Sequence, residues 1–163
     1  MVEIEIRKIS SLDQNWIKEL FQKEWFSDKV ISQGRIYQYK NLQGFIAVYQ
    51  NKRVGMITYT IKNEKILEII SINSLKKNIG IGTEFVNHIT KFAKSRQIDK
   101  IEVVTTNDNL KALKFYQKCG FKIMTVNVNI MREYRKIKPE IPLKAENGIL
   151  IRDEFILQKK LNH

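Results

Sequence analysis

Two glycines placed between an expected strand and an expected helix are the feature of this sequence best suited to bind a ligand. Residues 77–83 read Lys-Asn-Ile-Gly-Ile-Gly-Thr, so Gly80 and Gly82 are separated by one residue. Glycines at these positions let successive backbone amides point outward, and the following helix adds the positive end of its dipole. The segment could therefore bind a pyrophosphate, although the same spacing also fits a tight turn that binds nothing. It differs from the two best-known phosphate loops, because Lys-Ser or Lys-Thr does not follow Gly82 and a third glycine is absent.

A second pattern, between Thr105 and Phe121, supports the binding interpretation. The residues that define it are Asn109, Ala112, Tyr116, Gly120 and Phe121. In these residues the sequence resembles the GNAT superfamily of acetyl-CoA-dependent N-acetyltransferases, of the bacterial single-domain type, whose second signature runs Asn, two residues, Ala, three residues, Tyr and soon Gly-Phe. The first motif of that family, R/Q-x-x-G-x-G/A, requires glycines where Gly80 and Gly82 stand, with Lys77 in place of Arg or Gln. The resemblance covers nearly the whole chain.

The resemblance implies acetyl-CoA as the co-substrate and no metal. Backbone amides between Asn78 and Thr83 would hold the pyrophosphate, and the strand end at Ile72 to Ser74 would pair with the pantetheine amides as an added strand does. Ile72 is expected to donate to the thioester carbonyl, and Asn109 to hold the pantetheine arm through its side-chain amide. The cofactor-binding residues expected in this way are Ile72, Asn73, Ser74, Lys77, Asn78, Ile79, Gly80, Ile81, Gly82, Thr83, Asn109 and Tyr116.

The resemblance also implies a general acid at Tyr116, which would protonate the departing thiolate. The alternative is a tyrosine packed between a helix and the sheet without a chemical role. A base must take the proton of the amine, and Glu68, inside an otherwise apolar strand, resembles the strand glutamate that some family members use directly or through water. Glu102 on the next expected strand is the second candidate, and water alone is the third.

The elements that position these residues follow from the hydrophobic periods. Apolar alternation indicates strands, and spacings of three and four residues indicate helices, as in the first expected helix with Trp16, Leu20 and Trp25. Ser11 or Asp13 is expected to cap that helix. The expected elements are a strand at Val2–Ile9, the helix from Ser11 to Trp25, a loop or short helix at 34–42, strands at Phe45–Gln50, Val54–Ile61 and Lys65–Ile72, a helix at Gly82–Arg96, a strand at Lys100–Thr106, a helix at Asn109–Lys118, and strands at Phe121–Ile130 and Ile149–Leu161.

This order predicts one α/β domain over residues 1–163, with a mixed, largely antiparallel sheet that is split near its centre and flanked by helices. The split would admit the pantetheine arm. Residues 131–150 contain both prolines and are expected to form a long loop before the last strand. This loop could act as a lid over the acceptor amine or as a contact in a homodimer.

The net charge of +12 is typical of proteins with an anionic partner, but the proportion of lysine to arginine argues against nucleic acid. The sequence has 22 lysines and 7 arginines, whereas nucleic-acid readers favour arginine and clustered basic faces. No signal sequence or membrane span is recognised, so we expect a cytoplasmic protein without membrane contact. The function predicted is acetyl transfer to a primary amine of a small molecule or protein. The alternative is a non-catalytic module on the same fold that binds CoA or nucleic acid.

Overall fold

The computed structural model of the chain describes residues 3–25 and 27–163. Val2, in the first expected strand, lies outside the described residues, as does the side chain of Trp25 in the first expected helix. Among the described residues, no helix combines the length and the apolar character needed to cross a membrane.

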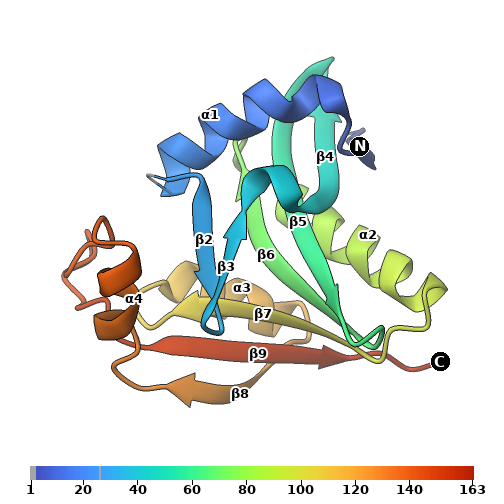
Figure 1. Cartoon of the computed structure of the whole chain (residues 1–163). Helices are drawn as coiled ribbons and strands as arrows, with labels where there is room; N and C mark the ends of the chain where they lie inside the picture. Colours follow the sequence, from blue (N-terminus) through green and yellow to red (C-terminus); the bar gives the residue numbers. More distant parts are fainter. Residues whose placement is uncertain (1–2, 26) are drawn as a thin grey trace.

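A seven-stranded sheet runs through the molecule in the order β1-β4-β5-β6-β7-β9-β8 (Figure 1). All neighbouring strands are antiparallel except β6 and β7, which are parallel. The predicted mixed, largely antiparallel sheet is thus confirmed. Its strands are β1 (Glu5–Lys8), β4 (Gln43–Tyr49), β5 (Lys52–Lys62), β6 (Ile66–Ser74), β7 (Lys100–Thr106), β8 (Lys122–Asn127) and β9 (Glu154–Lys160).

Helices cover both faces of this sheet. Helices α2 (Ile81–Ser95) and α3 (Leu110–Lys118) pack on one face, where Phe85 and Ile89 of α2 are fully buried. Helix α1 (Gln14–Trp25) packs on the other face through Ile17 and Phe21. Each helix presents apolar residues three or four positions apart, which places them on one side. These are the helices that the sequence predicts, apart from shifts of one to three residues at their ends.

The sheet opens between β6 and β7. The two strands pair only from Ile66 to Ile69 on β6 and from Lys100 to Val103 on β7. Ile70 has no partner on β5 either, because the register shifts there, and such a bulge bends a strand. Beyond this point the two strands diverge (Figure 1). We call the diverging ends of β6 and β7 the arms of the split, and they correspond to the split that the sequence predicts.

A hairpin lies over the split on the α1 side (Figure 1). It consists of β2 (Lys29–Ser32) and β3 (Arg35–Gln38), joined by Gln33 and Gly34, which both have positive φ. Two such residues form the tight turn that suits a two-residue hairpin. The expectation of a loop or short helix at 34–42 was therefore wrong, apart from a single 3-10 turn at Tyr39–Asn41.

The expected long loop at 131–150 and the expected start of the last strand also need correction. A fourth helix, α4 (Met131–Ile137), begins within the expected loop, and the last strand begins only at Glu154. Strand β8 ends at Asn127 rather than Ile130, because Asn129 adopts a left-handed conformation and turns the chain into α4.

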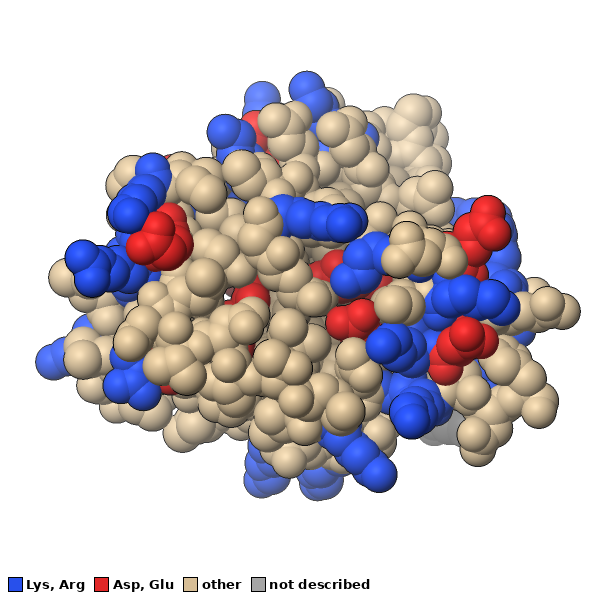
Figure 2. Space-filling model, turned by 60° about the horizontal axis from the view of Figure 1, so that its bottom comes forward, with Lys and Arg blue, Asp and Glu red and all other residues tan. Residues whose placement is uncertain are grey.

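Strand β8 forms one edge of the sheet, and its apolar side chains are unusually exposed. Met124 is 54% and Ile123 41% exposed, because β8 pairs with β9 alone. Figure 2 brings the side with β8 and β9 forward; uncharged side chains cover much of its lower half, and Lys and Arg lie along the edges and toward the right, with Asp and Glu among them. On this side of the molecule the charged side chains are thus unevenly distributed.

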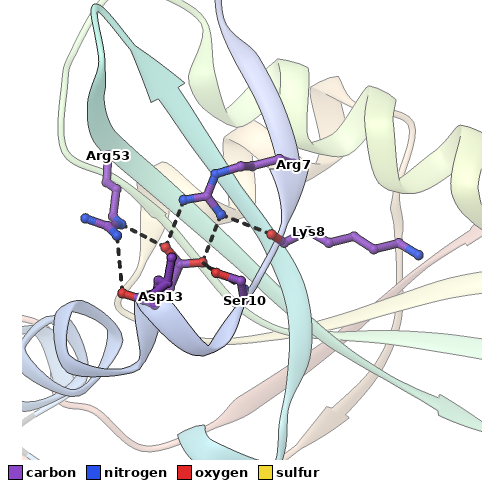
Figure 3. A network of polar contacts seen from close by, with 6 residues as sticks. Arg7, Lys8, Ser10, Asp13 and Arg53 are labelled. Carbon is purple, nitrogen blue, oxygen red and sulfur yellow. Dashed lines mark hydrogen bonds and ion pairs between the residues drawn. The ribbon is translucent and has the colours of Figure 1, made fainter.

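An ion-pair network anchors the start of α1 to the sheet (Figure 3). The fully buried carboxylate of Asp13 accepts two hydrogen bonds of 2.8 Å from Arg7 of β1 and one of 2.8 Å from Arg53 of β5. It also accepts a hydrogen bond from the backbone N–H of Ser10, so Ser10, rather than Ser11 or Asp13, caps the 3-10 turn at Ser11–Asp13 that leads into α1. The Arg7 guanidinium holds the pKa of Asp13 well below its usual range.

Candidate active site

A hollow of about 350 Å³ lies where the β6 arm ends and α2 begins. Gly80 precedes the helix with a φ of +80°, and Asn78 has a φ of +62°. The amide of Glu84 donates to the Gly80 carbonyl, whereas the three helical amides before it have no carbonyl four residues back in the helix. These amides and the helix dipole attract an anion. The lining residues are Ile72, Ser74, Lys76, Lys77, Asn78, Gly80, Ile81, Gly82, Thr83 and Phe115.

Eight of the twelve expected cofactor-binding residues line this hollow, and four do not. Ile79 packs against the core under α2, and Asn73 pairs with Met56, whose side chain belongs to the α1 side. Asn109 and Tyr116 belong to α3 and lie outside the lining. Lys76 and Phe115 line the hollow without having been predicted.

Gly82 is needed for the close approach of two helices. A Cβ atom at this position would lie 3.1 Å from a ring carbon of Phe115, which is tighter than most such contacts. A larger residue would push the Phe115 ring, which itself lines the hollow. Gly82 therefore keeps the hollow open by leaving space for the Phe115 ring of α3.

Tyr116 is buried in the core between the aromatic rings of its neighbours. It is 4% exposed, and its ring centroid lies 5.3 Å from that of Phe115 and 5.6 Å from that of Phe121. Burial raises the pKa of the Tyr116 hydroxyl well above its usual range. The hydroxyl therefore keeps its proton at neutral pH, as a general acid must.

Asn109 begins α3. Its side-chain oxygen accepts a hydrogen bond of 3.1 Å from the amide of Ala112, which is the usual bond of a helix N-cap. The cap accounts for an asparagine at this position without a ligand. The side-chain nitrogen of Asn109 remains free to donate to a pantetheine arm.

Glu68 is completely buried beneath the hairpin, at the closed end of the split. Its carboxylate accepts hydrogen bonds from the hydroxyl of Ser32 and from the side-chain amide of Gln33, and it lies 3.0 Å from the ammonium of Lys62. The hydroxyl of Tyr37 lies 3.5 Å from its second oxygen. Glu68 thus faces the side of the sheet opposite α2 and α3, with Tyr37 as its half-buried neighbour.

Glu102 and Glu154 bring two further carboxylates to this place. Glu102 is 5% exposed and accepts a hydrogen bond of 3.3 Å from the side chain of Gln33. Glu154, which the sequence analysis missed, accepts hydrogen bonds from the backbone of Gln33, at 3.2 Å, and from the hydroxyl of Tyr134, at 3.1 Å. Burial and the Glu154 carboxylate raise the pKa of Tyr134 to about 12. A signal for Glu154 existed, because it precedes the apolar run Phe155-Ile156-Leu157.

No three His, Cys, Asp or Glu side chains are arranged to hold a metal ion within residues 3–25 and 27–163. The hollow and the glutamates described above make up a site of two parts on opposite sides of the split. One part is the amide-lined hollow beside α2, and the other is the set of buried carboxylates beneath the hairpin.

The chain thus combines a split mixed sheet with an amide-lined hollow at the start of α2. A profile of the acetyltransferase (GNAT) family matches residues 13–121, and the chain belongs to this family. The family resemblance seen in the sequence is confirmed, and with it the assignment as an acyltransferase.

Two relatives come from Bacillus subtilis strain 168 and are named as uncharacterized proteins. YxbD is 42% identical over 146 residues, which cover 89% of this chain and 91% of YxbD. YdhI is 38% identical over 154 residues, which cover 94% of this chain and 96% of YdhI. Among solved structures, a GNAT family acetyltransferase from Elizabethkingia anophelis with acetyl-CoA bound is similar with a TM-score of 0.71 and 22% identity, over 97% of this chain and 98% of that one. The latter similarity confirms the fold.

Proposed function

We propose that this protein transfers the acetyl group of acetyl-CoA to a primary amine by direct attack within a ternary complex. The observation that carries the proposal is the hollow between the β6 arm and the first turn of α2, where unpaired amides and two lysines converge in a chain of the acetyltransferase (GNAT) family. The similar structure from Elizabethkingia anophelis binds acetyl-CoA, which supports the same donor here.

In this proposal, the pyrophosphate of acetyl-CoA accepts hydrogen bonds from the amides of residues 81–83 and is attracted by Lys76 and Lys77. The β6 arm from Ile70 to Ser74 no longer pairs with β7, so its backbone groups on that edge are available to the pantetheine amides. The acetyl group then lies toward the closed end of the split. Asn109 contributes the donor of its side-chain nitrogen, while its oxygen caps α3.

The reaction forms a bond from the amine nitrogen to the thioester carbonyl carbon and breaks the bond from this carbon to sulfur. The sulfur leaves with the electron pair of that bond and takes a proton from the Tyr116 hydroxyl. The amine nitrogen loses a proton, for which Glu68 is the proposed acceptor and Glu102 the second candidate. Because Glu68 is completely buried, the proton passes to it through the Tyr37 hydroxyl or a water molecule.

Strands from both ends of the chain, β1 and β9, belong to one sheet, which supports a single domain over residues 1–163. Together with acetyl-CoA as the donor, we propose a cytoplasmic location for the protein.

The experiment combines calorimetric titration with CoA and a thiol-release assay with acetyl-CoA and a panel of primary amines. The proposal predicts saturable CoA binding and amine-dependent thiol release. Binding of CoA without thiol release for any amine would instead favour a non-catalytic CoA-binding module. The absence of CoA binding would contradict the proposal entirely.

A further inference from the structure

We infer that the acceptor is a primary amine carried by an apolar group, and that a second hollow, between α4 and the hairpin, binds that group. This inference rests on the proposed acetyl transfer and assigns its acceptor. The second hollow has a volume of about 220 Å³, and we call it the acceptor pocket. Its lining residues are Glu24, Val30, Ile31, Thr106, Met131, Tyr134, Lys138, Glu140, Ile141, Pro142 and Ile151.

The walls of the acceptor pocket are mostly apolar. Val30 of the hairpin and Met131 of α4 are buried, and Ile31, Ile141 and Ile151 are half-buried around them. Tyr134 adds an aromatic ring whose hydroxyl is turned to Glu154. Such walls favour an apolar group, because binding buries apolar surface of the ligand and the pocket without removing water from polar side chains of the walls.

The position of the acceptor pocket connects it to the split. Thr106 is the last residue of the β7 arm and lines the pocket. Since side chains alternate along a strand, Thr106 faces the same side as Glu102, which is the hairpin side. The first hollow, proposed above for acetyl-CoA, lies at the end of the β6 arm. It is lined by Phe115 of α3 and therefore lies on the α2 and α3 side of the sheet, opposite the hairpin. An acceptor in the pocket would thus approach the split from the side opposite acetyl-CoA, as direct attack requires.

The pocket is preformed, since hydrogen bonds hold its walls in place. The guanidinium of Arg135 donates to the carbonyl oxygens of Ile141 at 3.2 Å, Pro142 at 2.7 Å and Ile151 at 2.6 Å. These bonds fix the segments on either side of the pocket to α4. A preformed pocket binds its ligand without the cost of ordering a loop.

Two further bonds fix α4 and the segment after it to the hairpin. The amide of Gly34 donates to the Tyr134 hydroxyl at 2.9 Å, and the Lys138 ammonium donates to the carbonyl oxygen of Lys29 at 3.0 Å. The segment after α4 is therefore part of a wall, which assigns it to the acceptor side rather than to a free loop.

The charge around the pocket disfavours an acidic group. Two carboxylates, Glu24 and Glu140, line it together with one ammonium, that of Lys138, which donates to the hairpin backbone. A negative balance here contrasts with the net charge of +12 of the chain. It repels a carboxylate on the group that enters the pocket. An apolar amine without an acidic group fits both the walls and the charge.

Steady-state kinetics with ethylamine, hexylamine and 6-aminohexanoate tests the inference. We expect kcat/KM for hexylamine to exceed that for ethylamine by at least about tenfold, since hexylamine has four more methylene groups to bury. The 6-aminohexanoate ion, which ends in a carboxylate, should react no better than ethylamine. Filling the pocket with Ile141→Phe should remove the advantage of hexylamine, whereas Leu143→Phe, at a 71% exposed position outside the lining, should preserve it.

A binding measurement makes the test independent of turnover. In the CoA complex, hexylamine should shift the NMR signal of the Met131 methyl group, which lines the pocket, and leave that of Met124 on β8 unchanged. Equal kcat/KM for ethylamine and hexylamine, or an unchanged Met131 signal at saturating hexylamine, would overturn the inference. Thiol release with all three amines at equal kcat/KM contradicts only this inference, whereas CoA binding without acetylation of any amine contradicts the proposed function.

Discussion

Glu68 and Glu102 lie directly opposite each other on β6 and β7, one residue before the pairing of these strands ends. Two buried carboxylates at this register would repel each other if nothing else were present. The ammonium of Lys62 lies 3.0 Å from Glu68 and 3.7 Å from Glu102, and the side chain of Gln33 donates to both. The closed end of the split therefore contains a polar network that either glutamate could use to receive a proton.

The two glutamates can be separated by their effect on the pH dependence of the rate. If Glu68 is the base, the rise of kcat/KM for the amine with increasing pH should disappear in Glu68→Gln, since the amide keeps the shape but cannot take a proton. Glu102→Gln is the matched control from the opposite strand. The pH profiles of kcat/KM for both variants and for the wild type show which glutamate is the base.

A normal profile in Glu68→Gln with a flattened profile in Glu102→Gln would transfer the role to Glu102. Normal profiles in both would show that the amine arrives without its proton. Thermal unfolding of each variant serves as the control for folding, because Glu68→Gln also weakens the contact with Lys62.

Removal of the Tyr116 hydroxyl should slow turnover. In Tyr116→Phe the departing thiolate has no acid, so kcat should fall roughly 10²-fold, while CoA affinity stays within about twofold. Because burial raises the pKa of Tyr116 above its ordinary value of 10.0, loss of its proton should not reduce the wild-type rate below that pH. Single-turnover kinetics check both statements, and a wild-type rate in Tyr116→Phe would rule out the role.

The contribution of backbone amides to CoA binding can be tested at Thr83. Thr83 is exposed in the first turn of α2, and its amide has no intrahelical partner. Thr83→Pro removes this N–H within the first helical turn, where no intrahelical bond is lost, whereas Thr83→Ala keeps it. We expect Thr83→Pro to weaken CoA binding by about tenfold in calorimetry, as the loss of a hydrogen bond to a charged group predicts, and Thr83→Ala to bind normally. Equal affinities in the two variants would exclude this amide from the site.

Much of the fold could be predicted from the sequence, because apolar periodicity reports burial. The strands between Gln43 and Ser74 contain mostly apolar runs that are buried on both faces, and α2 carries Ile81, Phe85 and Ile89 on one face, so both regions were predicted nearly to their ends. The hairpin was not, because its two strands have four residues each and its turn requires a positive φ at Gln33, which that residue type rarely adopts.

The candidate site divides in the same way. The glycines at 80 and 82 and the helix after them form a local motif, which spacing alone can reveal. The contact of Gln33 with Glu154 joins residues 121 positions apart and follows from the packing of the hairpin on the sheet. Similarly, the contact between Gly82 and Phe115 depends on how α2 and α3 pack, so no local pattern could indicate it.

The ion-pair network at Asp13 predicts a pH-dependent contribution to stability. The pKa of Asp13 in the folded protein lies below its ordinary value of 3.8, so its stabilising effect is present above that pH and is lost as the pH falls through the lower folded value. Asp13→Asn should therefore lower the free energy of unfolding at pH 7 by about 1–3 kcal/mol, as expected for lost charge-assisted bonds.

Urea unfolding of the wild type and Asp13→Asn at several pH values checks this prediction. The difference between them should narrow below about pH 4, where the unfolded wild-type chain takes up a proton at Asp13. A difference that stays constant from pH 7 to pH 3 would contradict the assigned role of the carboxylate charge.

Mass spectrometry of the reaction of acetyl-CoA with hexylamine and other primary amines tests the central claim most directly. The account predicts one free CoA for each N-acetylated amine, formed only when protein is present, and no acetylated protein when acetyl-CoA is supplied alone, since the amine attacks the thioester itself. Release of CoA without an acetylated amine, or a stable acetyl-protein that forms first and then transfers its group, would contradict the account.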